Sequence, residues 1–186
     1  MRFQWALLWR ERRIVSLGML VLGPMLCVEG ISGWRLWGSI LFLAAMLCIS
    51  AMDCRYGLIF DRLLLPLGAV GLCLDFLGLL VSPWDGLLGA AAGFLSLFLV
   101  RWGSRGGMGG GDVKYAAVLG LWLGWKLLLL ALFLAFLAGS LAALGVVVCC
   151  RIRRDRIPFG PFLSLGAWTA LLWGASLFRW YEGIWP

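Results

Sequence analysis

The sequence predicts an all-α, polytopic integral membrane protein. Hydrophobic residues make up 63% of the chain, charged residues only 13%, and the mean hydropathy is +0.98, so a soluble globular domain is excluded. The apolar residues come in long runs, whereas the strands of a membrane β-barrel alternate polar and apolar positions. Twelve tryptophans and many clustered Leu, Ala and Gly residues are typical of helices that pack closely in lipid.

Seven apolar runs, one of them short, are predicted to be transmembrane segments. A helix needs about 20 residues to cross the ~30 Å hydrocarbon core, and shorter runs are tolerated when they are buried against neighbours. In order along the chain the runs are Ile14–Val28, Leu36–Met52, Leu63–Val81, Leu87–Val100, Val113–Leu123, Leu127–Cys150 and Phe162–Phe178. Residues 1–186 are therefore expected to form a single transmembrane domain. The sequence specifies no oligomeric state.

Basic residues predict the orientation of these segments, because Arg and Lys concentrate in cytoplasmic loops. Every second loop is basic: the arginines lie at positions 10, 12 and 13, then 55 and 62, then 101 and 105, then 151, 153, 154 and 156. This alternation puts the N-terminus in the cytoplasm and the C-terminus outside. A cleaved signal peptide over residues 1–30 is the alternative. The alternation of basic and non-basic loops disfavours it, because this alternation requires the first run to be a transmembrane segment.

Several classes of function find no support in the composition. The net charge of +7 is spread over short clusters between apolar runs, which is typical of topology signals and not of a nucleic-acid-binding surface. The chain has no histidine, and its six cysteines form no C-x-x-C pair. We therefore expect no metal site, no cofactor, no disulfide framework and no histidine-based triad.

Two aspartates are the candidates for chemistry. Asp53 ends the second run and Asp112 begins the fifth, and an even number of crossings places both on the cytoplasmic side. Two adjacent carboxyl groups can hydrolyse a peptide bond without a metal, because one stays protonated and polarises the carbonyl while the other activates water. The alternatives are an ordinary N-cap for Asp112 and an interfacial charge for Asp53. Asp75, near the outer end of the third run, has no predicted role.

The motifs around both aspartates resemble those of the type IV prepilin peptidases, which are intramembrane aspartic proteases of the GxGD kind. Gly109-Gly110-Gly111-Asp112-Val113-Lys114 followed by "YAAVLGLWLGW" resembles the family's second motif, and "DCRYGLIFDRLLLP", from Asp53 to Pro66, resembles its first. A third stretch, "IPFGPFLSLGAW", is similar to the entry of the family's last helix. Presenilin-type GxGD proteases carry a Tyr-Asp motif, whereas Asp53 follows Met52.

The resemblance implies an activity and a location. The expected substrate is a type IV prepilin or pseudopilin with a short basic leader, cut after a glycine at the cytoplasmic face of the bacterial inner membrane, with lipid as the only other expected partner. Phe60 stands where the bacterial enzymes usually have proline. The family's zinc-binding C-x-x-C insertion is absent from this sequence, so we expect cleavage without N-methylation.

Other residues of these motifs are candidates for substrate binding or loop shape. Gly109 and Gly111 leave room for a second aspartate and a substrate backbone, and Gly160 belongs to the third stretch. Lys114 is two positions from Asp112 and so faces elsewhere, towards lipid headgroups or a substrate carboxylate or carbonyl. Pro158 and Pro161 favour extended chain before the last span, either to hold substrate or simply to begin a helix.

Helix dipoles suggest that Asp53, at a helix C-terminus, is the proton-bearing acid and that Asp112, at an N-terminus, is the base. Three alternatives remain for the whole chain: an archaeal-type preflagellin peptidase, a degenerate family member, and a non-catalytic transporter or assembly factor. A transporter is disfavoured, because the sequence shows no repeat and both aspartates lie at helix ends and not at the bilayer midplane.

Overall fold

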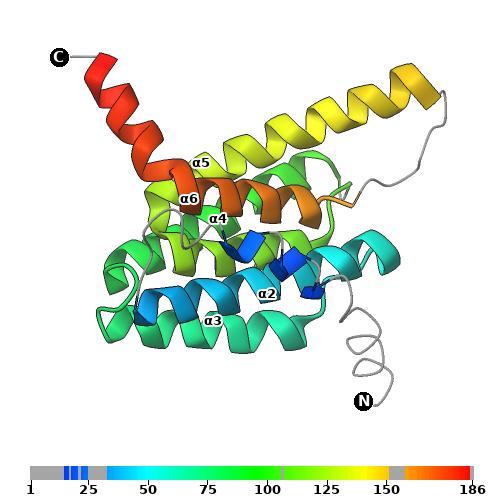
Figure 1. The fold of residues 1–186 in the computed structure, drawn as a ribbon. Coiled ribbons are helices and arrows are strands. Elements are labelled where there is room, and N and C mark those ends of the chain that lie inside the picture. The colour runs from blue at the N-terminus through cyan, green and yellow to red at the C-terminus, as the bar shows by residue number, and fades with distance from the viewer. Residues whose placement is uncertain are drawn as a thin grey trace.

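The described part of the chain is helical and contains no strand, which confirms the all-α prediction. The structure, a computed structural model, describes residues 15–16, 18–20, 22–24, 33–105, 107–150 and 158–184. Its elements are α2 (Trp34–Tyr56), α3 (Asp61–Phe76), α4 (Pro83–Gly103), α5 (Gly110–Cys150) and α6 (Gly160–Ile184) (Figure 1). The first predicted run, 14–28, lies only partly within the described residues, and those that are described are helical.

Four described helices are long and apolar enough to cross a membrane: Leu36–Tyr56, Pro83–Gly103, Gly110–Gly145 and Gly160–Gly183. Large apolar side chains such as Leu65, Phe133 and Leu141 are exposed on the outside of the bundle, as lipid contact requires. The polytopic membrane class is thereby confirmed, whereas the count of seven crossings remains a prediction.

Glycine in the left-handed conformation ends α2 and α3. Gly57 (φ 61°) follows α2, and its N–H donates to the carbonyl of Asp53. Gly78 (φ 68°) follows α3, and the next N–H, of Leu79, donates back to Leu74 O, which is the Schellman pattern. The prediction of one apolar span from 63 to 81 was therefore too long, because an apolar run does not show where a glycine turns the chain.

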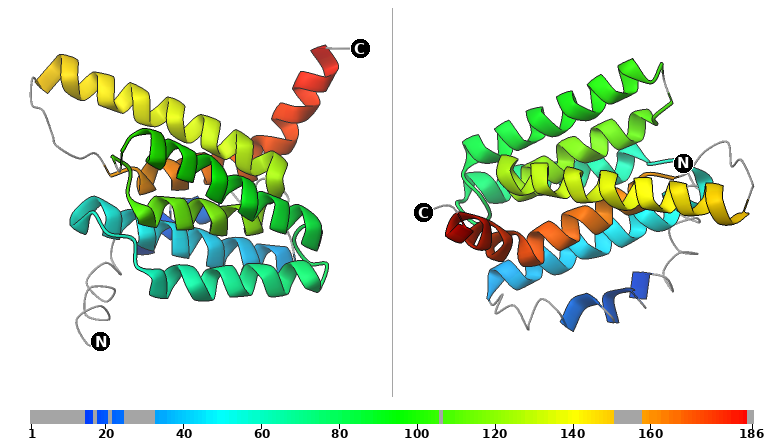
Figure 2. Two further views of the ribbon diagram at one scale, coloured as in Figure 1. Left: turned by 180° about the vertical axis from the view of Figure 1, so that it is seen from behind. Right: turned by 90° about the horizontal axis from the view of Figure 1, so that it is seen from above.

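The chain doubles back within α5. Gly124 has φ 72° and ψ 171°, a non-helical conformation that favours glycine, and it separates a short segment, 110–123, from a long one, 125–150. All three views show the two segments running in opposite directions from this point (Figures 1 and 2). The break agrees with the predicted boundary between the runs that end at Leu123 and begin at Leu127.

Close backbone contacts hold the short segment of α5 against α4. A Cβ atom at Gly89 would collide with the carbonyl oxygen of Gly120, and one at Gly93 would collide with that of Ala116. Small residues thus let the two helices approach until their backbones touch, as is common between membrane helices.

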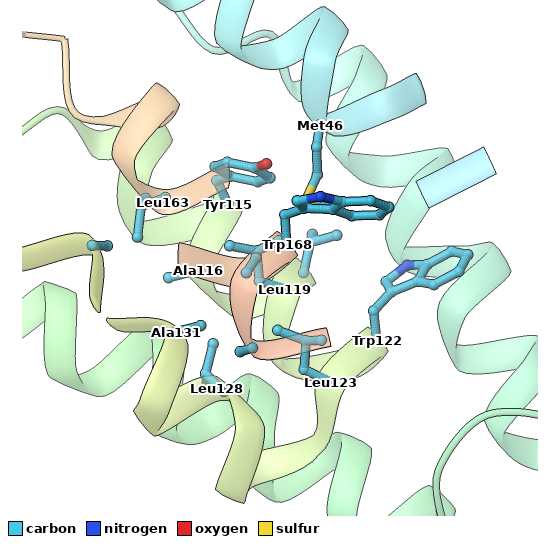
Figure 3. Packing of buried hydrophobic residues seen from close by; sticks show 14 of the residues in the cluster. Met46, Tyr115, Ala116, Leu119, Trp122, Leu123, Leu128, Ala131, Leu163 and Trp168 are labelled. Atoms are coloured by element: carbon cyan, nitrogen blue, oxygen red, sulfur yellow. The ribbon is translucent and has the colours of Figure 1, made fainter. Parts of the chain in front are cut away.

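The core lies between α2, the short segment of α5 and α6. Figure 3 shows side chains from all three converging there, among them Met46, Leu119 and Trp168, and each is at most 7% exposed. Trp122 stacks on Phe42 with ring centroids 4.7 Å apart, and its Nε1–H donates to Leu67 O at 3.0 Å. The short segment of α5 is therefore surrounded by protein and tied to α2, α3, α4 and α6.

Candidate active site

Five of the described helix ends meet at one end of the bundle. The C-terminal ends of α2 and α4 lie beside the N-terminal ends of α3, α5 and α6. Three contacts show this: Gly160 N–H donates to Asp53, Lys114 pairs with Asp61, and Gly110 packs against the guanidinium of Arg101. Loops and helix termini from distant parts of the sequence are thereby brought to one place, which is the usual setting for a functional site.

Asp53 lies in the last turn of α2 and is 6% exposed. The backbone N–H of Gly160 donates to its Oδ2 at 2.7 Å, across 107 residues of sequence. A Cβ atom at Gly160 would lie 2.7 Å from the same oxygen, too close for any real side chain. The beginning of α6 therefore holds the Asp53 carboxyl directly, and only glycine fits there.

Asp112 lies in the first turn of α5 and is 7% exposed. Its Oδ1 is buried and has no hydrogen-bond partner among the described residues. A Cβ atom at Gly109 would lie 2.9 Å from Oδ2, so the glycine before the aspartate leaves room for the carboxyl group. A buried carboxyl oxygen without a partner is unusual in a folded protein, and such groups are typical of reaction and binding sites.

The Asp53 and Asp112 carboxyl groups lie close enough to interact electrostatically. They come from segments 59 residues apart in the sequence. Two nearby carboxyl groups cannot both ionise easily, and such a pair therefore tends to carry one proton. The arrangement has the chemical components of a general acid and a general base.

The remaining predicted site residues surround this pair. Gly111 packs on Ile59, since a Cβ atom there would lie 2.8 Å from the Ile59 Cβ. Lys114 points away from Asp112 and forms an exposed ion pair with Asp61, Nζ to Oδ2 2.6 Å. Asp61 is the first residue of α3, and this ion pair joins the beginning of α3 to α5.

The two prolines behave differently. Pro158 lies before α6 in non-helical chain, as expected. Pro161 is the second residue of α6, so of the two alternatives for these prolines it is the beginning of a helix, and not extended chain, that holds at this position. The first turn of a helix tolerates proline, because the missing N–H has no intrahelical acceptor.

Three hydroxyl groups near the pair, two of them buried and that of Ser50 half-buried, were not predicted. Tyr115 Oη lies 2.7 Å from Ser164 Oγ, and Ser50 Oγ donates to the same atom at 2.7 Å. In the sequence, each of these residues lies one helical turn from a site residue: Tyr115 from Asp112, Ser164 from Gly160 and Ser50 from Asp53. That spacing carries no information until the pairing of helices is known.

Asp75 lies at the opposite end of the bundle. It is fully buried, and its Oδ1 accepts the backbone N–H of Val81 at 3.2 Å. Its Oδ2 lies against Gly86 at the beginning of α4. In the described ranges no three His, Cys, Asp or Glu side chains are grouped closely enough to hold a metal ion.

Comparisons with known proteins bear on the identity of the chain. A sequence model of the type IV leader peptidase family matches residues 40–144, which include both aspartates. The chain is 38% identical over 155 residues to the prepilin leader peptidase/N-methyltransferase of Aeromonas hydrophila, covering 80% of this chain and 53% of that protein. It is 40% identical over 157 residues to the protein of the same name from Pseudomonas aeruginosa, again covering 80% and 53%.

A third relative, from Aeromonas salmonicida and of the same name, is 35% identical over 174 residues, which cover 90% of this chain and 60% of the relative. The chain thus spans about half the length of the curated relatives it matches. No solved structure matches. The family match covers more than half of the chain, and the resemblance seen in the motifs is confirmed: this chain belongs to the type IV leader peptidase family.

Proposed function

We propose that this protein is an intramembrane aspartic endopeptidase that removes the leader peptide from type IV prepilin or pseudopilin precursors. The observation that carries the proposal is the meeting of Asp53 and Asp112, both buried, at one end of the bundle. Family membership supports the substrate class, because the relatives are named prepilin leader peptidases.

In this mechanism one carboxyl group acts as general base and the other as general acid. One aspartate takes a proton from water as the oxygen attacks the scissile carbonyl carbon, and the other donates its proton to the carbonyl oxygen. The tetrahedral diol then collapses: the first aspartate gives its proton to the leaving nitrogen, the C–N bond breaks, and a diol hydroxyl returns a proton to the second aspartate. The pair ends with one proton, as it began, so no metal or nucleophilic side chain is needed.

An unpaired buried oxygen favours Asp112 as the acid. Each carboxyl group interacts with one backbone N–H, Asp53 with that of Gly160 and Asp112 with that of Gly109, and a hydrogen bond to a charged group contributes about 1.5–3 kcal/mol. Asp112 Oδ1 has no partner among the described residues and is free to hold the proton. We therefore propose Asp112 as the acid and Asp53 as the base, the reverse of the assignment that the helix dipoles suggest.

An open hollow of about 690 Å³ lies beside Gly110 and Gly111, the two residues before Asp112, and is lined also by Arg62, Arg101 and Lys114; we propose that substrate approaches the pair from this side. The glycines expose backbone next to Asp112, and a substrate in extended conformation can approach there. Gly109, Gly111, Lys114, Pro158, Gly160 and Pro161 are the residues that we assign to loop shape and substrate contact.

The location follows from the distribution of charge. Arg55, Arg62, Arg101 and Arg105 all lie at the helix ends that carry the pair, which supports a cytoplasmic position for this end by the positive-inside rule. We therefore propose a multi-pass protein of the bacterial inner membrane with a cytoplasmic N-terminus and with cleavage, after a glycine, at the cytoplasmic face.

For these 186 residues we propose cleavage without methyl transfer, because they contain no C-x-x-C pair. The relatives carry both activities in their names. The absence of histidine and of a grouped metal-ligand set in the described residues leaves the aspartates as the groups to which we assign the chemistry.

The test is a cleavage assay with the full chain in detergent and a leader-bearing pilin precursor. Wild type should remove the leader, and both Asp53→Asn and Asp112→Asn should lose activity while keeping their helical circular dichroism. An intact leader with wild type, or cleavage by either variant, contradicts the proposal. Transfer of a labelled methyl group from S-adenosylmethionine to the product would contradict only the absence of methyl transfer.

A further inference from the structure

A cluster of three hydroxyl groups, from Ser50 of α2, Tyr115 of α5 and Ser164 of α6, lies in the core beneath the aspartate pair. Ser164 Oγ is the centre, 2.7 Å from Ser50 Oγ and 2.7 Å from Tyr115 Oη. Tyr115 is fully buried and Ser164 is 8% exposed. Three helices that are distant in sequence are thereby joined at a single oxygen atom.

The hydrogen bonds of the central oxygen are complete. A serine hydroxyl has one donor and two acceptor sites. Ser164 accepts from Ser50 and pairs with Tyr115, where either hydroxyl can donate, and carbonyl oxygens of Gly160 at 3.0 Å and Met46 at 3.4 Å are within reach of its proton. A fully satisfied buried network of this kind fixes one arrangement of the helices, because a buried polar group left without its partner is costly.

Each hydroxyl lies one helical turn from a residue of the candidate site. Ser50 precedes Asp53 by three residues on α2, Tyr115 follows Asp112 by three on α5, and Ser164 follows Gly160 by four on α6. Positions three or four apart share a helix face. The cluster therefore joins the same three helices as Asp53, Asp112 and Gly160 do, one helical turn further into the bundle.

We propose that Ser50, Tyr115 and Ser164 are positioning residues that set the spacing of Asp53 and Asp112. None of them is placed to touch substrate. Their effect passes along α2, along the first turns of α5, and through Gly160, whose N–H holds Asp53 while its carbonyl accepts from Ser164. The proposal rests on the proposed function for its catalytic consequence, but the spacing of the pair can be measured without substrate.

The first experiment compares kinetics in the full chain. Ser164→Ala should lower kcat about 10- to 100-fold with little change in KM, since a misplacement near 1 Å costs up to about 100-fold. Tyr115→Phe should have a smaller effect, because Ser50, Ser164 and Gly160 remain joined. Ser164→Thr, which keeps the hydroxyl, should recover most of the rate.

Thr169→Val is the matched control. Thr169 is on the same helix, and its hydroxyl donates only within α6, to Leu165 O at 2.8 Å. If Thr169→Val lowers kcat as much as Ser164→Ala, or if Ser164→Ala retains wild-type kcat, the proposal is overturned. A merely structural role would lower thermal stability in Ser164→Ala and leave the kcat of the folded fraction unchanged.

The second experiment follows the carboxyl groups by infrared titration without substrate, with Asp53→Asn and Asp112→Asn to identify the bands. The two macroscopic pKa values belong to the pair and depend on its spacing. Ser164→Ala should change their separation and Thr169→Val should not. Wild type that shows this coupling but no cleavage refutes the proposed function alone, whereas an unchanged separation in Ser164→Ala refutes the positioning role alone.

Discussion

Gly160→Ala tests the contact that joins α6 to Asp53. The added methyl group would lie 2.7 Å from Asp53 Oδ2 and 3.1 Å from its Cβ, whereas ordinary contact begins near 3.4 Å. The carboxyl group or the beginning of α6 must therefore move by about 0.7 Å, in a direction that lengthens the 2.7 Å hydrogen bond from Gly160 N–H.

The magnitude follows from that hydrogen bond. A bond to a carboxylate contributes about 1.5–3 kcal/mol. If this stabilisation is lost, the proton of the pair moves towards Asp53, and the fraction of molecules in which Asp53 is ionised and can act as base falls by up to roughly 10- to 150-fold, because 1.36 kcal/mol is a factor of ten. We expect kcat to fall within that range and KM to change less.

The assay is single-turnover cleavage of a prepilin peptide by Gly160→Ala in detergent, with helicity checked by circular dichroism. Gly183→Ala on the same helix is the control, because a Cβ atom there would meet no atom within 4 Å. Cleavage by Gly160→Ala at the wild-type rate would show that the α6 contact does not position Asp53. An equal loss in both variants would assign the effect to α6 as a whole.

Three further predictions concern residues away from the pair. Gly124→Ala, at φ 72°, should destabilise the folded chain by about 1–2 kcal/mol in a denaturation series in detergent, and an unchanged midpoint would contradict the strain argument. Asp75→Ala leaves the Val81 N–H without its acceptor, so the free energy of unfolding should fall by about 1–3 kcal/mol in the same measurement. The kcat of the folded protein should stay at the wild-type value, and a large fall in kcat would show that Asp75 contributes to catalysis. Lys114→Gln removes an ion pair with Asp61 whose side chains are 55% and 54% exposed. Because surface pairs contribute about 0–1 kcal/mol, the thermal midpoint should change little. A large drop in the midpoint would show that this pair stabilises the fold.

The fold class could be predicted from the sequence because membrane helices are determined mainly by long apolar runs. The break at Gly124 was visible as the gap between two such runs. The common side of Asp53 and Asp112 followed from counting crossings and basic loops, which requires no knowledge of packing. In both cases the prediction depended on a one-dimensional pattern.

Contacts between helices could not be predicted in the same way. A helix surrounded by lipid and protein is apolar on all sides, so its periodicity does not show which face is buried. Nothing in the apolar runs therefore distinguishes Ser50, Tyr115 and Ser164 from their neighbours. The partner of Lys114 could not be predicted either, because its pair with Asp61 depends on the packing of α3 beside α5. The sequence could not decide between the two alternatives for Pro161, because proline has the same sequence signature before a helix and in its first turn.

The backbone contact between α4 and the short segment of α5 has a consequence for motion. Where Gly89 meets Gly120 and Gly93 meets Ala116, no flexible side chain lies between the two helices to absorb a displacement. The unit that carries Asp112 should therefore open less readily than the last turn of α2, which carries Asp53. Hydrogen exchange of the intact protein in nanodiscs should be slowest at the amides of 113–120 and faster in the last turn of α2. The reverse order would contradict a rigid contact between α4 and the short segment of α5.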